Sequence, residues 1–210
     1  ITEMIKDSTF TNREDFKVDR NLINLNNGIL NIENKKLIPH GPEYLFFTKI
    51  PVDYNDKAEC PTIRKFLSEI LPEEHVKIIY QWFGYCLYRS YFIKKAVIFV
   101  GETNTGKSTL IKLFVKFIGS ENTSGVCLQK IASDKFASSS LYNKHINVFD
   151  DLDSKDVNDN GLFKIATGDG IITGEKKFNE QFQFQNYAKL TFACNKIPEV
   201  KDINDPAYFG

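Results

Sequence analysis

The segment Gly101-Glu-Thr-Asn-Thr-Gly-Lys-Ser108 has residue types and a spacing suited to holding phosphate groups. It matches the pattern G-x-x-x-x-G-K-[ST] at each defined position. Glycines let the backbone N–H groups of such a loop surround a phosphate, helped by the positive end of the following helix. Lys107 is expected to reach the β- and γ-phosphates, and the Ser108 hydroxyl to bind Mg²⁺. The predicted nucleotide-binding residues are Gly101, Glu102, Thr103, Asn104, Thr105, Gly106, Lys107, Ser108 and Thr109.

Apolar residues on both sides of this loop predict the strand and the helix that it needs. Ala96–Val100 is a continuous apolar run, which is typical of a strand buried on both faces. Thr109–Ile118 continues as a helical pattern that ends at Gly119. This context disfavours the alternative interpretation, an incidental glycine-rich turn.

Two adjacent acids, Asp150 and Asp151, follow a second apolar run, Ile146–Phe149, roughly forty residues after the loop. One carboxylate at this place can sit beside Mg²⁺ while its neighbour orients or deprotonates the attacking water. We assign Asp150 to the metal and Asp151 to the water. A solvated acidic loop is the alternative, because Asp153 and Asp156 follow closely.

Asn195 ends a third apolar run, Lys189–Cys194. Its amide can hydrogen-bond the γ-phosphate and the water, although an asparagine there could also cap a turn. Lys189 is expected only to begin the strand. The predicted catalytic residues are therefore Lys107, Asp150, Asp151 and Asn195, with Ser108 and Asp150 as the metal ligands.

The elements that position these residues are a mostly parallel sheet and its helices. Buried strands with polar residues at their C-terminal ends predict a ligand site at that edge of the sheet. A helix at about Gly161–Ala166 and a hairpin across Ile171–Phe184 are expected between the second and third strands.

The first part of the chain has a different pattern. Short apolar alternations within Leu22–Ile38 surround an Asn-Gly step, which predicts a hairpin. Glu43–Asp53 is expected to form a short strand at most, and Pro61 and Pro72 to begin two helices. We therefore predict a small α+β/helical domain at residues 1–92 and an α/β ATPase core at residues 93–210.

Composition limits the functions that are open to the chain. Lys+Arg and Asp+Glu both number 27, so no global field attracts a polyanion, although a local stripe of lysines can still bind nucleic acid. No apolar run is long enough for a membrane span. The four cysteines and three histidines are scattered, so neither a zinc site nor a disulfide framework is expected, and the histidines should have structural or surface roles. The start at Ile1, without an initiator Met or signal features, is typical of a piece cut from a longer protein. Scattered cysteines favour reduced thiols in a cytoplasmic compartment.

The loop, the paired acids and Cys194-Asn-Lys-Ile-Pro198 lie within about 95 residues, and together they resemble the superfamily 3 helicases of the AAA+ group. The similarity is to primase-helicases of plasmids, phages and large DNA viruses. It extends upstream through Leu25–Leu30, Ile50–Tyr54 and Trp82–Tyr85, which resemble the domain that precedes the ATPase. The resemblance covers about residues 20–210. It implies an AAA+-type P-loop core, incomplete at its C-terminus, with ATP and Mg²⁺ as cofactors.

The same resemblance assigns a DNA-binding hairpin. Leu162–Asp169 and the following residues resemble the family motif whose hairpin carries a lysine into a central channel to grip single-stranded DNA. The DNA-binding residues implied are Lys176, Lys177 and Phe178, and the working form implied is a hexameric ring with ATP between subunits. Two lysines beside an aromatic ring also suit phosphate pairing and base stacking on physical grounds. A solvated turn is the alternative.

The arginines depart from the family pattern. The chain has Arg13, Arg20, Arg64 and Arg89 and none after residue 89. Family members place an arginine finger shortly after the motif that ends here in Asn195. Weak hydrolysis is therefore expected of this segment, and a lysine in that role would lack the bidentate fork of arginine.

The predicted function is that of an ATP-dependent DNA helicase fragment from a replication protein. A non-helicase AAA+ loader or remodeller is one alternative, from which only the hairpin lysines and the upstream domain distinguish it. A P-loop small-molecule kinase is another, disfavoured by the paired acids and by the lack of arginine after Arg89.

Overall fold

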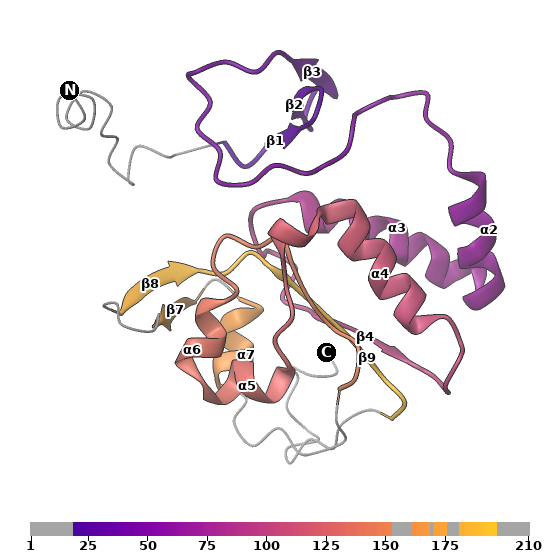
Figure 1. Cartoon of the computed structure of the whole chain (residues 1–210), viewed down its shortest axis with the longest axis vertical. Helices are drawn as coiled ribbons and strands as arrows, with labels where there is room; N and C mark the ends of the chain where they lie inside the picture. The colour runs from indigo at the N-terminus through magenta and orange to yellow at the C-terminus, as the bar shows by residue number, and fades with distance from the viewer. Residues whose placement is uncertain (1–18, 153–160, 169, 176–180, 197–210) are drawn as a thin grey trace.

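The structure of the chain is a computed structural model that describes residues 19–152, 161–168, 170–175 and 181–196 (Figure 1). No described helix is long and apolar enough to cross a membrane. The first elements are β1 (Leu22–Leu25), β2 (Gly28–Asn31), β3 (Lys36–Ile38), α2 (Pro61–Ile70) and α3 (Glu73–Leu87). They are followed by β4 (Val97–Val100), α4 (Lys107–Ile118), η2 (Ser120–Asn122), β5 (Thr123–Ser124), α5 (Leu128–Ser133), α6 (Lys135–Ser139) and β6 (Ile146–Phe149). The last are α7 (Gly161–Ala166), β7 (Ile171–Gly174), β8 (Phe182–Gln185) and β9 (Lys189–Cys194).

The predicted N-terminal hairpin is confirmed as part of a small antiparallel sheet, β1-β2-β3. Gly28 has φ +150° in the turn, where a Cβ would approach the Ile38 carbonyl oxygen to 2.7 Å. Residues 43–53 form no strand. They nevertheless bond to the sheet, since the Ile50 amide donates to the Asn24 carbonyl at 2.9 Å and Asn26 to Val52 at 3.0 Å.

The two predicted helices are confirmed, and each starts at its proline. Pro61 is the first residue of α2, and Pro72 caps α3 with Glu73 and Glu74 in the first turn. Helix α3 buries Ile79, Trp82, Tyr85 and Cys86. It packs against α4, where the Phe83 and Phe114 rings stack at 3.8 Å.

Four of the described strands form a parallel sheet in the order β4-β9-β6-β5, which confirms the predicted α/β class with its parallel sheet. Strand β9 pairs on both sides and is buried along its whole length. The prediction that Ala96–Val100 is buried on both faces is wrong, because β4 is only half-buried and Val100 is 47% exposed. Within the described residues β4 has a neighbour on one side only, so its apolar run does not reflect a central place in the sheet.

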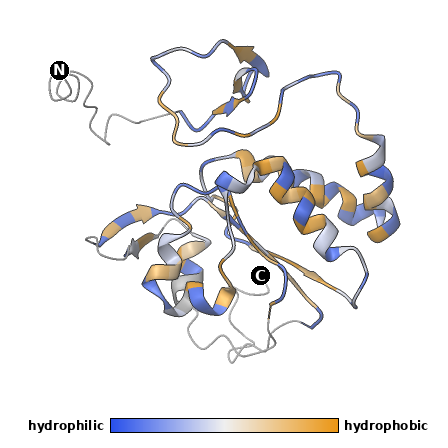
Figure 2. Ribbon diagram, in the orientation of Figure 1, coloured by the Kyte–Doolittle hydropathy of each residue, from blue (hydrophilic) through white to orange (hydrophobic). Residues whose placement is uncertain are grey.

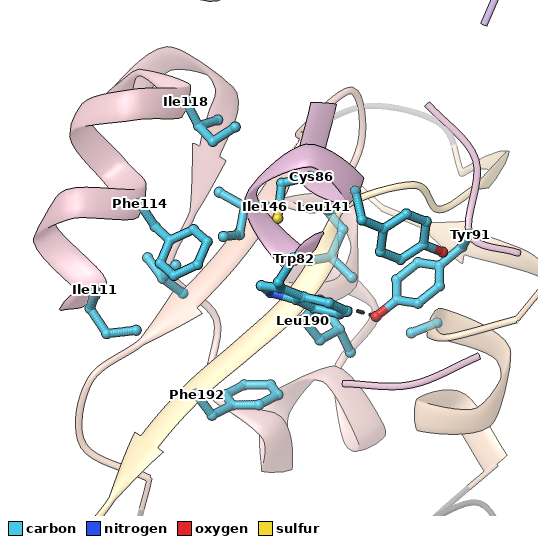
Figure 3. Packing of buried hydrophobic residues seen from close by; sticks show 14 of the residues in the cluster. Trp82, Cys86, Tyr91, Ile111, Phe114, Ile118, Leu141, Ile146, Leu190 and Phe192 are labelled. Atoms are coloured by element: carbon cyan, nitrogen blue, oxygen red, sulfur yellow. Dashed lines mark hydrogen bonds between the residues drawn. The ribbon is translucent and has the colours of Figure 1, made fainter. Parts of the chain in front are cut away.

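The core lies between this sheet and helices α3 and α4. Figure 3 shows Ile111, Phe114 and Ile118 of α4 directed toward the strands that carry Ile146 and Phe192. Trp82 enters from α3 and donates its indole N–H to the buried Thr191 hydroxyl at 2.9 Å. Orange segments on the central strands in Figure 2 mark the same apolar layer.

The remaining elements form a unit beside the sheet. Helix α6 packs against β7, and α5 against α7. The helix predicted at Gly161–Ala166 is confirmed as α7. The predicted hairpin is confirmed as β7 and β8, which pair antiparallel from Ile171↔Gln185 to Gly174↔Phe182.

His145 has the structural role that the sequence predicts. The ring is 2% exposed, with Nδ1 at 3.0 Å from the Cys86 carbonyl oxygen and Nε2 at 2.9 Å from the Thr48 hydroxyl. A carbonyl can only accept, so Nδ1 carries the proton and Nε2 accepts from Thr48. Burial lowers the pKa of His145 to about 4. The neutral ring therefore ties residue 48 to the start of β6 and the end of α3.

We expect this histidine to make stability dependent on pH. An unfolded histidine titrates near pH 6.5 and the folded one near 4, so the unfolded state takes up the proton first as the pH falls. The free energy of unfolding should then drop by about 2 kcal/mol from about pH 7 to about pH 5. Urea titrations across this range measure the slope. His145→Gln should flatten it, whereas His75→Gln, at an exposed position, should not; equal slopes in the two variants would contradict this role.

Candidate functional site

The candidate site lies where three parallel strands end. Val100 of β4 pairs with Cys194 of β9, and Phe149 of β6 pairs with Phe192. The Gly101 amide extends this pairing by donating to the Cys194 carbonyl at 3.3 Å. Because the strands are parallel, the segments that begin at Gly101, Asp150 and Asn195 leave the sheet at one edge. The three predicted groups of site residues therefore meet there.

The loop between β4 and α4 has the geometry of an anion-binding turn. Gly106 caps α4 with φ +92°, and a Cβ at this position would approach the Ile70 Cγ2 to 2.9 Å, so glycine is needed there. Asn104 is also left-handed, with φ +66°. The first amide to bond back into α4 is that of Leu110, which donates to the Gly106 carbonyl at 2.9 Å. The preceding N–H groups at residues 107–109 are thus free to receive an anion.

Lys107 is folded back onto its own loop. Its Nζ donates to the carbonyl oxygens of Gly101 and Glu102, each at 2.7 Å, and lies 3.5 Å from the Thr105 hydroxyl. These carbonyls hold the ammonium group over the loop. A phosphate placed in the loop would offer it stronger, charged acceptors.

A hydrogen bond links the loop to the paired acids. The Ser108 hydroxyl donates to Asp150 Oδ1 at 3.1 Å. Adjacent oxygen ligands of an octahedral Mg²⁺, each at ~2.1 Å, lie about 3 Å apart. The two oxygens are thus spaced as neighbouring Mg²⁺ ligands require, and together they could hold this ion.

Asp151 and Asn195 stand at the same edge and are both exposed. Asp151 follows the proposed metal ligand directly, and the next residue, Leu152, returns to the sheet by donating to the Ala193 carbonyl at 2.9 Å. Asn195 is the first residue after β9. Their roles toward water and phosphate stay predictions.

A cavity of about 560 Å³ adjoins the loop, and the sequence did not point to it. It is lined by Thr105 and Lys107 of the loop and by Ile70, Leu71 and Ile78 of the α2–α3 region. Its walls come from two separate segments, within residues 70–79 and 97–110, so no local pattern could have predicted it. Such a volume is in the range of small-molecule sites.

The predicted DNA-binding residues Lys176, Lys177 and Phe178 lie outside the described residues, as does Asp169. The two strands that lead to them, β7 and β8, are described. No cluster of three or more His, Cys, Asp or Glu that could hold a metal occurs among the described positions.

Two sequence families match the chain. Residues 99–206 match a family of unknown function (DUF5906), and residues 1–72 match a family described as D5 N terminal like. No curated protein matches it.

Solved structures share the fold. An apo structure of the NrS-1 C-terminal region is 22% identical with a TM-score of 0.55, covering 70% of this chain and 36% of that one. A second apo structure of this region is 19% identical with a TM-score of 0.56, covering 71% and 37%. A JCV helicase with a bound small molecule is 16% identical with a TM-score of 0.45, covering 64% and 39%. The chain thus spans little more than a third of the NrS-1 regions that it resembles. These matches support the predicted resemblance to primase-helicase proteins, and the NrS-1 structures themselves show a shared fold alone.

Proposed function

We propose that this chain, which belongs to the family of unknown function DUF5906, binds ATP with Mg²⁺ at Gly101–Ser108 and couples its hydrolysis to movement along single-stranded DNA. The observation that carries the proposal is the Ser108–Asp150 hydrogen bond of 3.1 Å. It joins the phosphate-binding loop to the paired acids at one edge of the sheet. A loop that only bound phosphate would not need a carboxylate at metal-ligand spacing.

Each residue of the site has a distinct role in this proposal. Lys107 leaves the Gly101 and Glu102 carbonyls and pairs with the β- and γ-phosphates. Ser108 and Asp150 would hold Mg²⁺, and the ion would supply positive charge to neutralise that on the phosphates. Asp151 orients the attacking water and accepts its proton, and the Asn195 amide donates to the γ-phosphate.

The direct test is to titrate the chain with a fluorescent ATP analogue and to measure phosphate release with and without oligo(dT). We expect Mg²⁺-dependent binding and slow hydrolysis that the oligonucleotide stimulates. Absence of nucleotide binding in the folded protein would overturn the proposal. Binding and hydrolysis without any effect of DNA would favour the loader or remodeller class instead.

The hairpin supplies the contact with DNA. We expect Lys176→Ala/Lys177→Ala to weaken oligo(dT) binding and to reduce the slope of log affinity against log salt by about 1.4, since two phosphate contacts are lost. ATP affinity should not change. Fluorescence anisotropy at several salt concentrations measures both quantities.

A matched control exists in the other hairpin. Lys35 and Lys36 are adjacent, exposed lysines at the β2–β3 turn, so Lys35→Ala/Lys36→Ala removes the same charge. We expect this variant to bind oligo(dT) like the wild type. An equal loss in both double variants would mean that net charge alone, and not the β7–β8 hairpin, governs DNA affinity.

The working assembly in this proposal is a ring of six chains with ATP between neighbours, and the full-length protein supplies the arginine finger. Light scattering of the full-length protein with ATP and DNA tests the ring. A monomer under these conditions would contradict it.

A further inference from the structure

A second cavity, of about 410 Å³, lies at the opposite edge of the parallel sheet. Tyr187, which lines it, lies two residues before the first residue of β9, whereas the phosphate-binding loop adjoins the last residue of that strand. Six strand residues at ~3.3 Å each separate the two edges by more than about 15 Å. A molecule in this cavity therefore cannot be the nucleotide bound at Gly101–Ser108.

Two of the four arginines of the chain, Arg20 and Arg89, line this cavity. Arg89 is half-buried and fixed in place, since its Nη2 donates to the carbonyl oxygens of Asp19 at 2.6 Å and Leu22 at 3.1 Å. Its guanidinium also lies 5.3 Å from the centre of the Phe46 ring. Arg20 is exposed and donates from Nη1 to the Ser90 hydroxyl at 3.4 Å.

Within residues 19–152 and the other described ranges, these contacts use only a minority of the guanidinium donors. An arginine has five N–H groups, and the described hydrogen bonds of Arg89 all come from one nitrogen. Within the described part of the chain, neither arginine forms an ion pair with a carboxylate. The Asp19 carboxylate is near Arg89, but it accepts from the Asn21 amide at 2.9 Å.

The charge of Arg89 is only partly compensated. Burial lowers the pKa of Arg89, and the neighbouring Arg20 lowers it further, while Tyr187 and Asp19 raise it. The side chain stays protonated at neutral pH. Two guanidinium groups that line one polar cavity are arranged to receive an anion between them.

Hydrogen bonds hold another part of the cavity lining in place. The Asn186 amide donates to the Ala166 carbonyl at 2.7 Å and to that of Ala188 at 3.1 Å, and it accepts from the Ala188 amide at 3.0 Å. This buried asparagine fixes the β8–β9 connection, which carries Gln185 and Tyr187 into the cavity.

We propose that this cavity binds a backbone phosphate of the single strand that the β7–β8 hairpin grips. The inference rests on the proposed function. The cavity lies at the base of β8, and three residue steps of ~3.3 Å place it about 10 Å from the end of β8 nearest the hairpin loop. Its volume is large enough for one nucleotide. A strand held at the hairpin loop could continue along β8 and place a phosphate between Arg20 and Arg89.

The experiment uses the 210-residue chain and labelled oligo(dT), with Arg20→Gln as the variant. Arg20 is exposed, so its replacement should not unfold the protein, and thermal melting checks this. A second variant, Arg20→Lys, keeps the positive charge but lacks the planar guanidinium that can bind a phosphate through two N–H groups. We expect Arg20→Gln to weaken oligo(dT) binding about five- to tenfold and to reduce the salt slope by about 0.7, with ATP affinity unchanged. The oligo(dT) affinity of Arg20→Lys should lie between those of the wild type and Arg20→Gln.

Arg64→Gln is the matched control, because Arg64 is an exposed arginine on α2 outside this cavity. Equal losses of oligo(dT) affinity in Arg20→Gln and Arg64→Gln would overturn the phosphate site while leaving the proposed function intact.

Titration with thymidine monophosphate distinguishes a site for a strand from a site for a free nucleotide. If Arg20→Gln weakens the binding of thymidine monophosphate but not that of oligo(dT), the assignment to a strand is wrong. A wild-type chain that binds no oligo(dT) would overturn the proposed function and this inference together.

Discussion

Lys107→Ala is expected to reduce ATP turnover by about 100-fold or more, because it removes the cation that the loop holds for the phosphates. Among the described residues, the Lys107 ammonium is bound by loop carbonyls and the Thr105 hydroxyl and forms no ion pair with a carboxylate. It can therefore move to a nucleotide without breaking an ion pair. Titration with a fluorescent ATP analogue and phosphate release in the full-length protein measure the loss.

A second lysine on the same helix provides the control. Lys112 lies on the exposed side of α4, so Lys112→Ala removes the same charge and leaves the loop intact. We expect its binding and turnover to equal those of the wild type. Unchanged turnover in Lys107→Ala would contradict the assignment of Gly101–Ser108 as the nucleotide site. Thermal melting should show both variants folded, because Lys107 is not part of the buried core.

The phosphate-binding loop and its partner acids were predictable because their chemistry is local. The spacing of Gly101, Gly106 and Lys107 is a property of a few consecutive residues. That Asp150 meets Ser108 follows from two parallel strands ending at one edge, which apolar runs followed by polar residues already indicate. The strand order β4-β9-β6-β5 does not follow in this way, since it depends on contacts between segments far apart in the chain.

Other features could not be predicted because they depend on tertiary surroundings. The run Ala96–Val100 has the apolar character of a central strand, yet β4 has a single described neighbour and its last residue is exposed. The cavity between Arg20 and Arg89 joins residues 69 positions apart. The spacing of hydrophobic residues in a segment predicts whether it forms a helix or a strand, but it does not predict which other segments pack around it.

Lys189 is the clearest case of a residue whose role is invisible in the sequence. It begins β9, as predicted, but it is also fully buried. Its ammonium donates to the carbonyl oxygens of Tyr88, Ser90 and Tyr187, so all three of its protons have acceptors. The group also lies 4.4 Å from the centre of the Tyr85 ring. Burial lowers its pKa to about 7, and the surrounding carbonyls and ring favour the charged form.

We therefore expect Lys189→Met to lower the free energy of unfolding by about 3 kcal/mol, because three buried carbonyls lose their donor while a similar volume stays filled. For a chain of this size the melting temperature should fall by about 10 °C. Lys112→Met, at an exposed position, should change it little. Urea unfolding monitored through Trp82 fluorescence measures both variants, and a loss below about 1 kcal/mol would mean that water or backbone movement satisfies these carbonyls.

Because two of the carbonyls belong to Ser90 and Tyr187, which line the arginine cavity, Lys189→Met should also weaken oligo(dT) binding while the protein is still folded.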